Sequence, residues 1–227
     1  FVTRENSRPA FGLADKQIGF WARFANNENV LRFPNWQDHV AWDGLGTQPP
    51  YPRFGRRLSL ENLMRPIRDR ENLEAWFTRR NRATLFTSHF NGVRRRLFRD
   101  CERTLGCDGF GKAFSGVPSS ASKLDITLNY RFSLCPENST GDGYVTEKIP
   151  EAFDAGCIPI TWVRPSDLER DFNPKAVVNL YGLKPVEVRS MMIKLSHDIR
   201  HVKALLSEPL IVNPPNLKSV RSFVIDE

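Results

Sequence analysis

Residues 130–162 read YRFSLCPENSTGDGYVTEKIPEAFDAGCIPITW, and this stretch decides the fold. Its first six residues, 130–135, are rich in aromatic and apolar side chains, which predicts a buried strand. Residues 147–155 predict a helix that ends at Gly156, and the apolar residues 157–162 predict a second strand. The order strand, loop, helix, strand is that of a parallel α/β unit, so the stretch predicts half of a Rossmann-like sheet.

Similar units lie on both sides of this stretch. Upstream, residues 83–87 predict a buried strand, and residues 94–105 predict a helix whose apolar side chains share one face. Downstream, residues 176–180 predict another strand, and residues 186–206 predict one long helix whose Met and Leu side chains face the core. Together these elements predict an α/β domain built on a doubly wound parallel sheet.

The first part of the chain carries weaker signals. Residues 1–3 and 17–21 predict short strands, and the prolines and glycines of residues 44–55 predict a long loop. Residues 59–81 have apolar side chains at helical spacing, which predicts one or two amphipathic helices interrupted by Pro66. We interpret this helical segment as a link between two lobes.

The charge of the chain calls for an anionic partner. The net charge is +7, and fourteen arginines lie between Arg53 and Arg103. Nucleic acid, a membrane surface and a phosphorylated substrate would all suit this charge, and a solvated basic face would need no partner at all. With 40% hydrophobic and 26% charged residues, the composition is that of an ordinary globular protein without an apolar run near the roughly 18 residues of a membrane span.

The four cysteines form no CxxC pair and are too sparse for a disulfide framework. We expect them to be buried thiols, which favours a reducing compartment. Cys101 and Cys107 are close enough in sequence that a disulfide between them stays open.

Two polar loops follow predicted strands, at the edge where open α/β sheets bind ligands. The first loop, residues 88–92, contains Ser88 and His89 and leads into the arginines 94–96. Because the N–H groups and the dipole of a helix N-terminus favour phosphate, this loop predicts an anion site in which His89 is a candidate contact.

The second loop, residues 137–148, ends on a lysine at a predicted helix start. Gly141 and Gly143 would allow a ligand to approach the backbone closely, and Thr146 is the expected N-cap of the helix. Lys148 would then lie beside the positive end of the helix dipole, which is unfavourable unless an anion fills the space between. The alternative is a solvated loop with an exposed lysine, but the convergence favours a diphosphate ligand.

These residues carry a resemblance to a known family. Residues 130–162 resemble the donor-binding signature of the α1,3/α1,4-fucosyltransferases of glycosyltransferase family 10, in their bacterial form. The resemblance continues into DFNPKAVVNL at residues 171–180. It also includes residues 88–112, similar to the arginine segment of the family, and TRENSRPAFGLADKQIGF at residues 3–20, similar to the end of its acceptor lobe.

The resemblance implies a GT-B type α/β fold of two lobes. Residues 1–80 would be the remainder of the acceptor-binding lobe with its linker, residues 81–227 would be the Rossmann-like domain that binds GDP-fucose, and most of the acceptor lobe would precede Phe1. The implied reaction is an inverting transfer of fucose from GDP-fucose to a hydroxyl of a glycan acceptor. GlcNAc or Glc of a Gal-containing oligosaccharide is the implied acceptor, with lipopolysaccharide biosynthesis and protein glycosylation as the implied settings.

The resemblance also implies roles for single residues. Glu5 matches the general base that takes the proton of the acceptor hydroxyl. Arg95 and Lys148 match the cations that hold the diphosphate as it leaves. The remaining donor-binding positions to expect are Ser88, His89, Asn138, Tyr144, Thr146 and Glu147, with Glu147 suited to accept hydrogen bonds from the ribose.

The family is expected to work without an essential metal or other cofactor. The chain contains no Asp-x-Asp triplet, which metal-dependent nucleotide-sugar enzymes commonly carry. Residues 106–112 match the glycines and lysine of a Walker A loop, but Ala113 follows where a Ser or Thr is needed. His197 and His201 share a helix face, but we find no third zinc ligand in the sequence to join them.

Three alternatives remain at this point: another GDP-sugar transferase, a catalytically inactive sugar-nucleotide-binding protein, and a nucleic-acid-binding basic module. We expect GDP-fucose and a glycan as partners rather than nucleic acid, and leave peripheral contact with a membrane and the oligomeric state open. Asn138-Ser139-Thr140 is a glycosylation sequon, and a glycan there would block the expected donor site. This favours a bacterial cytoplasmic enzyme, at the inner membrane surface if membrane-associated, over one in the Golgi lumen of a eukaryote.

Overall fold

The computed structural model describes residues 12, 15–42, 49, 51, 53–90, 92–114, 121–215 and 222–223 of the chain. Five strands form its central sheet: β5 (Arg80–Phe86), β6 (Cys107–Phe110), β7 (Tyr130–Leu134), β8 (Ile158–Thr161) and β9 (Val178–Asn179). They pair in parallel in the order β6-β5-β7-β8-β9. Ala83 of β5 lies opposite both Cys107 of β6 and Phe132 of β7.

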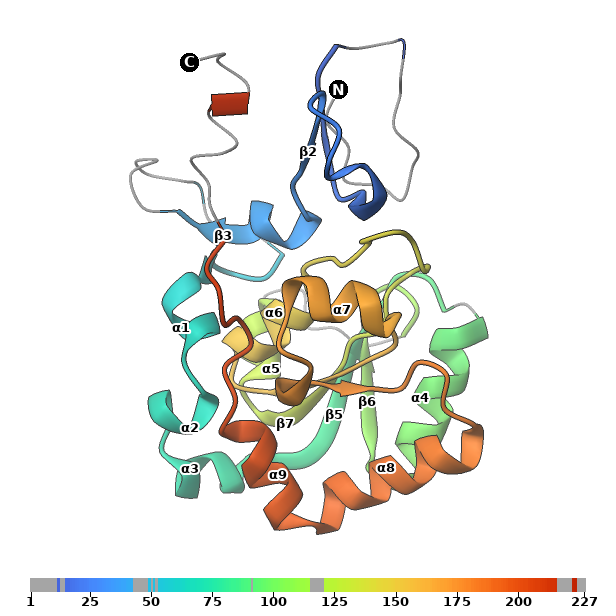
Figure 1. Cartoon of the computed structure of the whole chain (residues 1–227). Coiled ribbons are helices and arrows are strands. Elements are labelled where there is room, and N and C mark those ends of the chain that lie inside the picture. Colours follow the sequence, from blue (N-terminus) through green and yellow to red (C-terminus); the bar gives the residue numbers. More distant parts are fainter. Residues whose placement is uncertain are drawn as a thin grey trace.

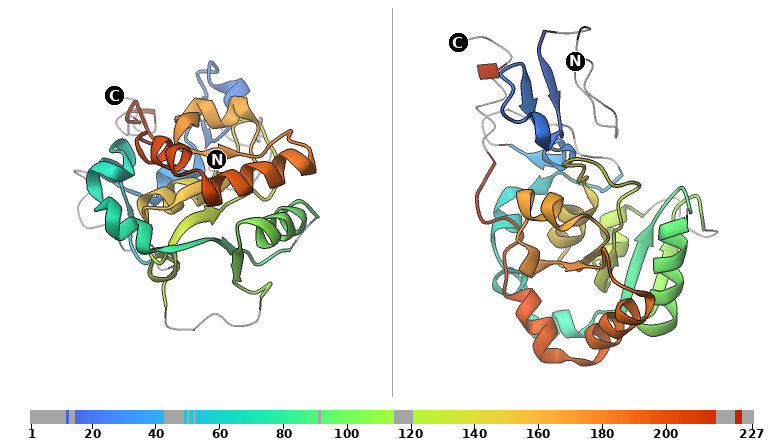
Figure 2. Two further views of the ribbon diagram at one scale, coloured as in Figure 1. Left: turned by 90° about the horizontal axis from the view of Figure 1, so that it is seen from below. Right: turned by 45° about the vertical axis from the view of Figure 1, so that its right-hand side comes forward.

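Helices cover both faces of this sheet, as Figures 1 and 2 show. The helices that connect the strands are α4 (Gly92–Thr104), α5 (Lys123–Thr127), α6 (Lys148–Asp154) and α7 (Pro165–Asp171). Because crossovers between parallel strands are right-handed, α4 lies on one face. The crossovers that contain the other three helices run in the opposite direction along the sheet, so these helices lie on the other face. The predicted α/β fold with a doubly wound parallel sheet is confirmed.

The N-terminal part adds small elements, of which the first lie above the sheet in Figure 1 and the last three helices lie to its left. Its strands pair in parallel as β1 with β2 and β3 with β4. In chain order the elements are β1 (Gln17–Gly19), η1 (Ala22–Phe24), β2 (Val30–Arg32), η2 (Asn35–His39), β3 (Val40–Ala41), β4 (Leu58–Ser59), α1 (Leu60–Met64), α2 (Ile67–Arg70) and α3 (Leu73–Thr78). Pro66 separates α1 from α2, as predicted, but the segment forms three short helices where one or two were expected. The strand expected at residues 1–3 lies outside the described residues.

A single apolar cluster joins the sheet to the segment before it. Trp36, Phe54 and Trp76 are fully buried in the same cluster as Phe132 of β7 and Phe153 of α6. Residues on both sides of the domain boundary that we expected at residue 80 therefore share one core. This packing fixes the linker relative to the sheet.

The four cysteines are buried thiols, and none forms a disulfide. The expectation of buried thiols is confirmed, and the alternative of a bond between Cys101 and Cys107 is wrong. Burial raises the pKa of the Cys157 thiol to about 12, against the smaller opposing effect of Arg79. Burial also raises the pKa of Cys107, where the neighbouring Cys101 thiol adds to the effect.

The C-terminal helical region differs from our expectation of one helix at residues 186–206. It consists of α8 (Pro185–His197) and α9 (Ile199–Leu206), preceded by η3 (Pro174–Ala176). Asp198 separates α8 from α9, and its side chain caps α9 by accepting a hydrogen bond from the His201 amide at 3.0 Å. Among the described residues, no helix combines the length and apolar character of a membrane span.

Strand β6 was not predicted. Its sequence, CDGF, has a polar residue and a glycine in four positions, so it lacks the apolar run that marks the other strands. Gly109 is needed in this strand because a Cβ there would lie 2.4 Å from the ring of Phe114. The stretch that resembled a Walker A loop is therefore part of the sheet.

Candidate functional site

A hollow lies where the strand order of the sheet reverses, between β5 and β7. The chain leaves β5 for β6 on one side and returns for β7 on the other, and ligands of open α/β sheets bind at such a point. Two adjoining cavities of about 230 and about 250 Å3 share four lining residues here: Arg53, Asn138, Glu147 and Lys148. The sequence had placed two anion loops at this edge, and the structure brings both of them to the hollow.

The buried carboxylate of Glu137 organises the second loop. It accepts a hydrogen bond from the amide of Thr146 at 2.8 Å and another from its hydroxyl at 2.8 Å. It also lies 2.9 Å from the ammonium of Lys148. Three donors on one carboxylate fold residues 137–148 back on themselves. The sequence offered no sign of this partnership, because Glu137 reads as one more polar loop residue.

Thr146 does not have the role that we predicted. The N-cap of α6 is Glu147, whose side chain makes no capping hydrogen bond. The hydroxyl of Thr146 instead lies 2.6 Å from the Lys148 ammonium, and it binds Glu137 as well. The expected N-cap is wrong because a buried carboxylate competes for the hydroxyl. Thr146 still lines one of the cavities.

Lys148 lies at the first position of α6, as predicted, but its ammonium already has carboxylate partners in the protein. Burial alone would lower the pKa of Lys148, but the carboxylates of Glu137 and Glu147 outweigh it and raise the pKa above its ordinary value. The Lys148 ammonium lies 3.7 Å from Glu147 Oε1. The ammonium is compensated by protein carboxylates and not only by a ligand, so that expectation is wrong, although the lysine does line both cavities.

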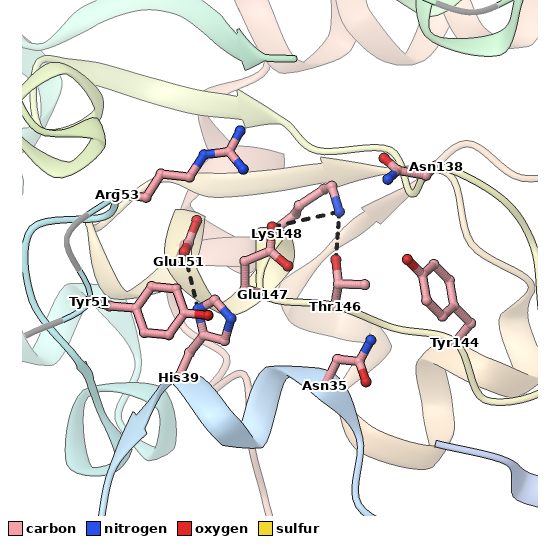
Figure 3. A pocket seen from close by; sticks show the side chains of 10 residues that line it. All are labelled: Asn35, His39, Tyr51, Arg53, Asn138, Tyr144, Thr146, Glu147, Lys148 and Glu151. Atoms are coloured by element: carbon pink, nitrogen blue, oxygen red, sulfur yellow. Dashed lines mark hydrogen bonds and ion pairs between the residues drawn. The ribbon is translucent and has the colours of Figure 1, made fainter. Parts of the chain in front are cut away.

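Glu147 stays ionised in this setting. Burial would raise its pKa, but the charges of Lys148, Lys123 and His39 outweigh burial and hold the pKa of Glu147 at about 2. Figure 3 shows its carboxylate in the cavity beside Lys148. An ionised carboxylate at this position can accept hydrogen bonds from sugar hydroxyls, as we expected for the ribose.

Helix α4 presents Arg94, not Arg95, to the hollow. Arg94 is buried, and it donates to the hydroxyl of Thr87 at 3.0 Å and to the backbone oxygen of Pro136 at 3.5 Å. Burial lowers the pKa of Arg94, and the nearby carboxylate of Glu137 opposes this. Arg94 thus stands at the end of β5 and reaches the loop that follows β7.

Arg95 points elsewhere. It is exposed, its guanidinium lies 5.6 Å from the ring centroid of Phe90, and it donates to the backbone oxygen of Phe90 at 3.3 Å. Successive residues of a helix are rotated by about 100°, so a shift of one position moves a side chain to another face. Arg94 shares the buried face of α4 with Leu97 and Cys101, a signal in the sequence that could have identified it.

Other predicted donor-binding residues do meet at the hollow. Ser88 and His89, both exposed, line one cavity, Tyr144 lines the other, and Asn138 lines both. Tyr144 packs edge to face against Phe20 of the N-terminal part, with ring centroids 5.1 Å apart. A Cβ on Gly143 would lie 2.4 Å from the backbone oxygen of Phe20, so this glycine allows the loop to dock there.

The structure adds lining residues that the sequence did not reveal. Figure 3 shows that Asn35 and His39 enter from η2 and that Tyr51 and Arg53 enter from the loop before β4. His39 Nδ1 lies 3.5 Å from Glu151 Oε1, and Lys123 is ion-paired with the same carboxylate. These residues come from segments far apart in the chain, so no local pattern marks them.

The structure does not test the expected general base or the expected absence of a metal. Glu5, the expected general base, lies outside the described residues. Within the part of the chain that the structure describes, no three His, Cys, Asp or Glu side chains gather as metal ligands would. The absence of a metal requirement stays a prediction.

Comparisons with known proteins agree on one family. Residues 76–200 match the family model described as glycosyltransferase family 10 (fucosyltransferase), C-terminal part. The chain is 33% identical to the α-(1,3)-fucosyltransferase FucT of Helicobacter pylori, over 98% of this chain and 48% of that protein. It is 30% identical to α-(1,3)-fucosyltransferase 4 of Bos taurus, over 48% of this chain and 26% of that protein.

Solved structures give the same result. A crystal structure of an α1,3-fucosyltransferase with GDP-fucose is 25% identical, with a TM-score of 0.76 over 99% of this chain and 72% of that one. The crystal structure with GDP gives a TM-score of 0.74 at the same identity and coverage. This likeness confirms the predicted GT-B type fold class. The chain spans about half the length of the first curated relative and about a quarter of the second.

Proposed function

Since this chain belongs to glycosyltransferase family 10, the fucosyltransferases, we propose that it binds GDP-fucose between β5 and β7 and transfers fucose to a glycan hydroxyl. The observation that carries this proposal is the convergence of Arg94 and Lys148. They come from two different crossovers of the sheet and line one cavity. A guanidinium and an ammonium in a shared hollow at the switch point suit a diphosphate.

The proposed reaction inverts the anomeric carbon. The acceptor oxygen forms a bond to that carbon on the face opposite the diphosphate, while the bond to the phosphate oxygen breaks and its electron pair leaves with GDP. The proton of the acceptor hydroxyl goes to a general base, for which Glu5 is the proposed residue. Fixed cations at the departing diphosphate stabilise the charge that develops there.

The contacts that hold the two cations support these roles. Arg94 is held by Thr87 and by backbone oxygens, and Lys148 is held by Glu137 and Thr146. Both cations are therefore in place before a ligand arrives, so little rearrangement is needed when negative charge appears. Glu147 is proposed to accept hydrogen bonds from the ribose, and Ser88, His89, Asn138 and Tyr144 to contact the rest of the donor.

The test compares sugar nucleotides. GDP-fucose is expected to raise the melting temperature more than GDP-mannose at equal concentration, and to be consumed in the presence of an acceptor that offers GlcNAc or Glc beside Gal. Equal stabilisation by both nucleotides would favour another GDP-sugar transferase. Binding without turnover would favour an inactive sugar-nucleotide-binding protein.

The arginine-rich segment can be tested against the nucleic-acid alternative. A nucleic-acid-binding module would bind DNA or RNA with an affinity that falls steeply with salt and does not depend on Lys148. The proposed transferase instead binds GDP, and Lys148→Ala abolishes this binding. Any weak binding of DNA or RNA to the arginine-rich segment would be unchanged in that variant.

We further propose that the enzyme works in the bacterial cytoplasm without a metal or other cofactor. Two observations support the compartment: the cysteines are unpaired thiols, and Asn138 of the sequon lines the donor cavity, where a glycan would obstruct it. Activity that survives EDTA would support the metal-free reaction. Acceptors from lipopolysaccharide and from glycoproteins, offered side by side, would identify the setting, and a vesicle-binding assay would test contact with the inner membrane surface.

A further inference from the structure

Arg53 lines the hollow although it comes from outside the segment that matches the family model. It lines both cavities, and it precedes the matching residues 76–200 by more than twenty positions. In Figure 3 its guanidinium extends from the loop before β4 toward the side of the cavity where Lys148 and Asn138 lie. The loop before β4 thus supplies a cation to a site whose other Arg and Lys side chains, Arg94, Lys123 and Lys148, come from the crossovers of the sheet.

The backbone of Arg53 is fixed while its side chain is not. The amide of Lys123 donates to the backbone oxygen of Arg53 at 3.3 Å, and the next residue, Phe54, is fully buried in the core. Arg53 itself is exposed, and its guanidinium makes no hydrogen bond or ion pair with any residue that the structure describes. Such a guanidinium can turn toward a ligand without breaking a contact, and only the rotamer freedom of the side chain is lost.

The other cations of the hollow have protein partners. Lys148 is ion-paired with Glu137, and Lys123 with Glu151. Arg94 donates to a hydroxyl and to backbone oxygens. Arg53 is near enough to Arg94 that its positive charge opposes that of Arg94. Two guanidiniums facing one cavity repel one another, and an anion between them would turn this repulsion into attraction.

We infer that Arg53 is a further binding residue, which closes on the diphosphate of the sugar nucleotide from the side opposite Arg94 and Lys148. This inference rests on the proposed function. The planar guanidinium suits two phosphate oxygens at once, which a lysine in this place would not. The loop before β4 would then take part directly in holding the leaving group, and its fixed backbone would set the distance between Arg53 and the cations on the other side of the diphosphate.

The experiment compares Arg53→Ala and Arg53→Lys with the unchanged chain, using GDP and guanosine as probes in titration calorimetry. Arg53→Ala is expected to bind GDP roughly tenfold to a hundredfold more weakly and guanosine unchanged, with Arg53→Lys between the two for GDP. Arg99→Ala, which removes an exposed arginine of α4, is the matched control and should bind GDP within about twofold of the unchanged chain. Circular dichroism checks that each variant is folded.

Two results would overturn the inference: GDP binding by Arg53→Ala within twofold of the unchanged chain, or an equal loss for GDP and guanosine. Failure of the unchanged chain to bind GDP would instead overturn the proposed function itself. The two failures are distinguishable, because the first requires an unchanged chain that binds GDP normally.

Discussion

The ammonium of Lys148 lies 2.9 Å from Oε2 of Glu137, and both side chains are withdrawn from solvent. Glu137→Gln keeps an acceptor for Thr146 but removes the charge that balances the lysine. Removing one partner of a buried ion pair is strongly destabilising, so we expect the free energy of unfolding in urea to fall by about 3 kcal/mol. GDP should restore more of the melting temperature in this variant than in the unchanged chain, because its diphosphate supplies the missing charge.

Glu61→Gln is the matched control for that experiment. Glu61 pairs with Arg65 on an exposed helix turn, and 75% of its side chain is accessible. Its loss should cost under about 1 kcal/mol. A cost for Glu137→Gln as small as this would show that Glu137 does not balance Lys148.

The low pKa of Glu147 predicts a pH dependence of stability. Its ordinary pKa is 4.5 and its pKa in the folded chain is about 2, so its contribution to stability is present above about pH 5. That contribution is lost as the pH falls toward 2. Between pH 7 and pH 3 the melting temperature of the unchanged chain should therefore fall further than that of Glu147→Gln. Parallel curves would contradict the prediction, and Glu74→Gln, at an exposed position of α3, is the control.

The positions of Arg94 and Arg95 predict unequal effects of two neighbouring substitutions on GDP affinity. Arg94→Lys keeps the charge but loses the contacts with Thr87 and Pro136, and we expect GDP to bind at least tenfold more weakly. Arg95→Ala should bind GDP within about threefold of the unchanged chain, because its guanidinium lies over Phe90 on the exposed face. Calorimetry decides between them, and the reverse order would restore Arg95 as the diphosphate ligand.

Arg32 of β2 is joined to Asp171 of α7 by two hydrogen bonds of 2.8 and 2.7 Å. This pair ties the N-terminal part to the sheet, and only 4% of the Asp171 side chain is accessible. Asp171→Asn should lower the free energy of unfolding by about 2 kcal/mol or more, and amide exchange in residues 17–32 should become faster. Arg68→Met, which breaks an exposed pair with Asp69, should cost under about 1 kcal/mol.

Glu5→Gln tests the proposed general base. The proposed role of Glu5 is proton transfer and not donor binding, so GDP affinity should stay within about twofold while transfer falls by at least a hundredfold. Calorimetry with GDP and a turnover assay with GDP-fucose measure the two quantities separately. A variant that loses GDP affinity and transfer together would place Glu5 in donor binding instead.

The sequence predicted the sheet better than the site. β5, β7 and β8 were found because apolar runs mark strands buried on both faces, and β6 was missed because Asp108 and Gly109 interrupt its run. Lys148 was found because its loop and helix are contiguous in sequence. Three consecutive arginines hid Arg94, although the buried positions 97 and 101 could have fixed the face of the helix.

Contacts between distant segments explain what could not be predicted. His39, Arg53 and Glu151 meet in the hollow only after the linker has packed against the sheet. Glu137 is close in sequence to Lys148, but its role depends on a loop conformation that no periodicity records. Local pattern thus identified the elements and one cation, whereas the balance of charge around that cation is a property of the folded chain.

The burial of every native thiol has a practical consequence. Because a maleimide reacts with accessible thiolates, a cysteine introduced at an exposed position such as Arg99 would be the preferred site of attachment for a fluorophore. A second dye at an exposed position before β5 would then give a distance to the sheet, and this distance should not change with nucleotide because the two parts share one core. Single-molecule fluorescence measurements therefore do not require the four native cysteines to be replaced first.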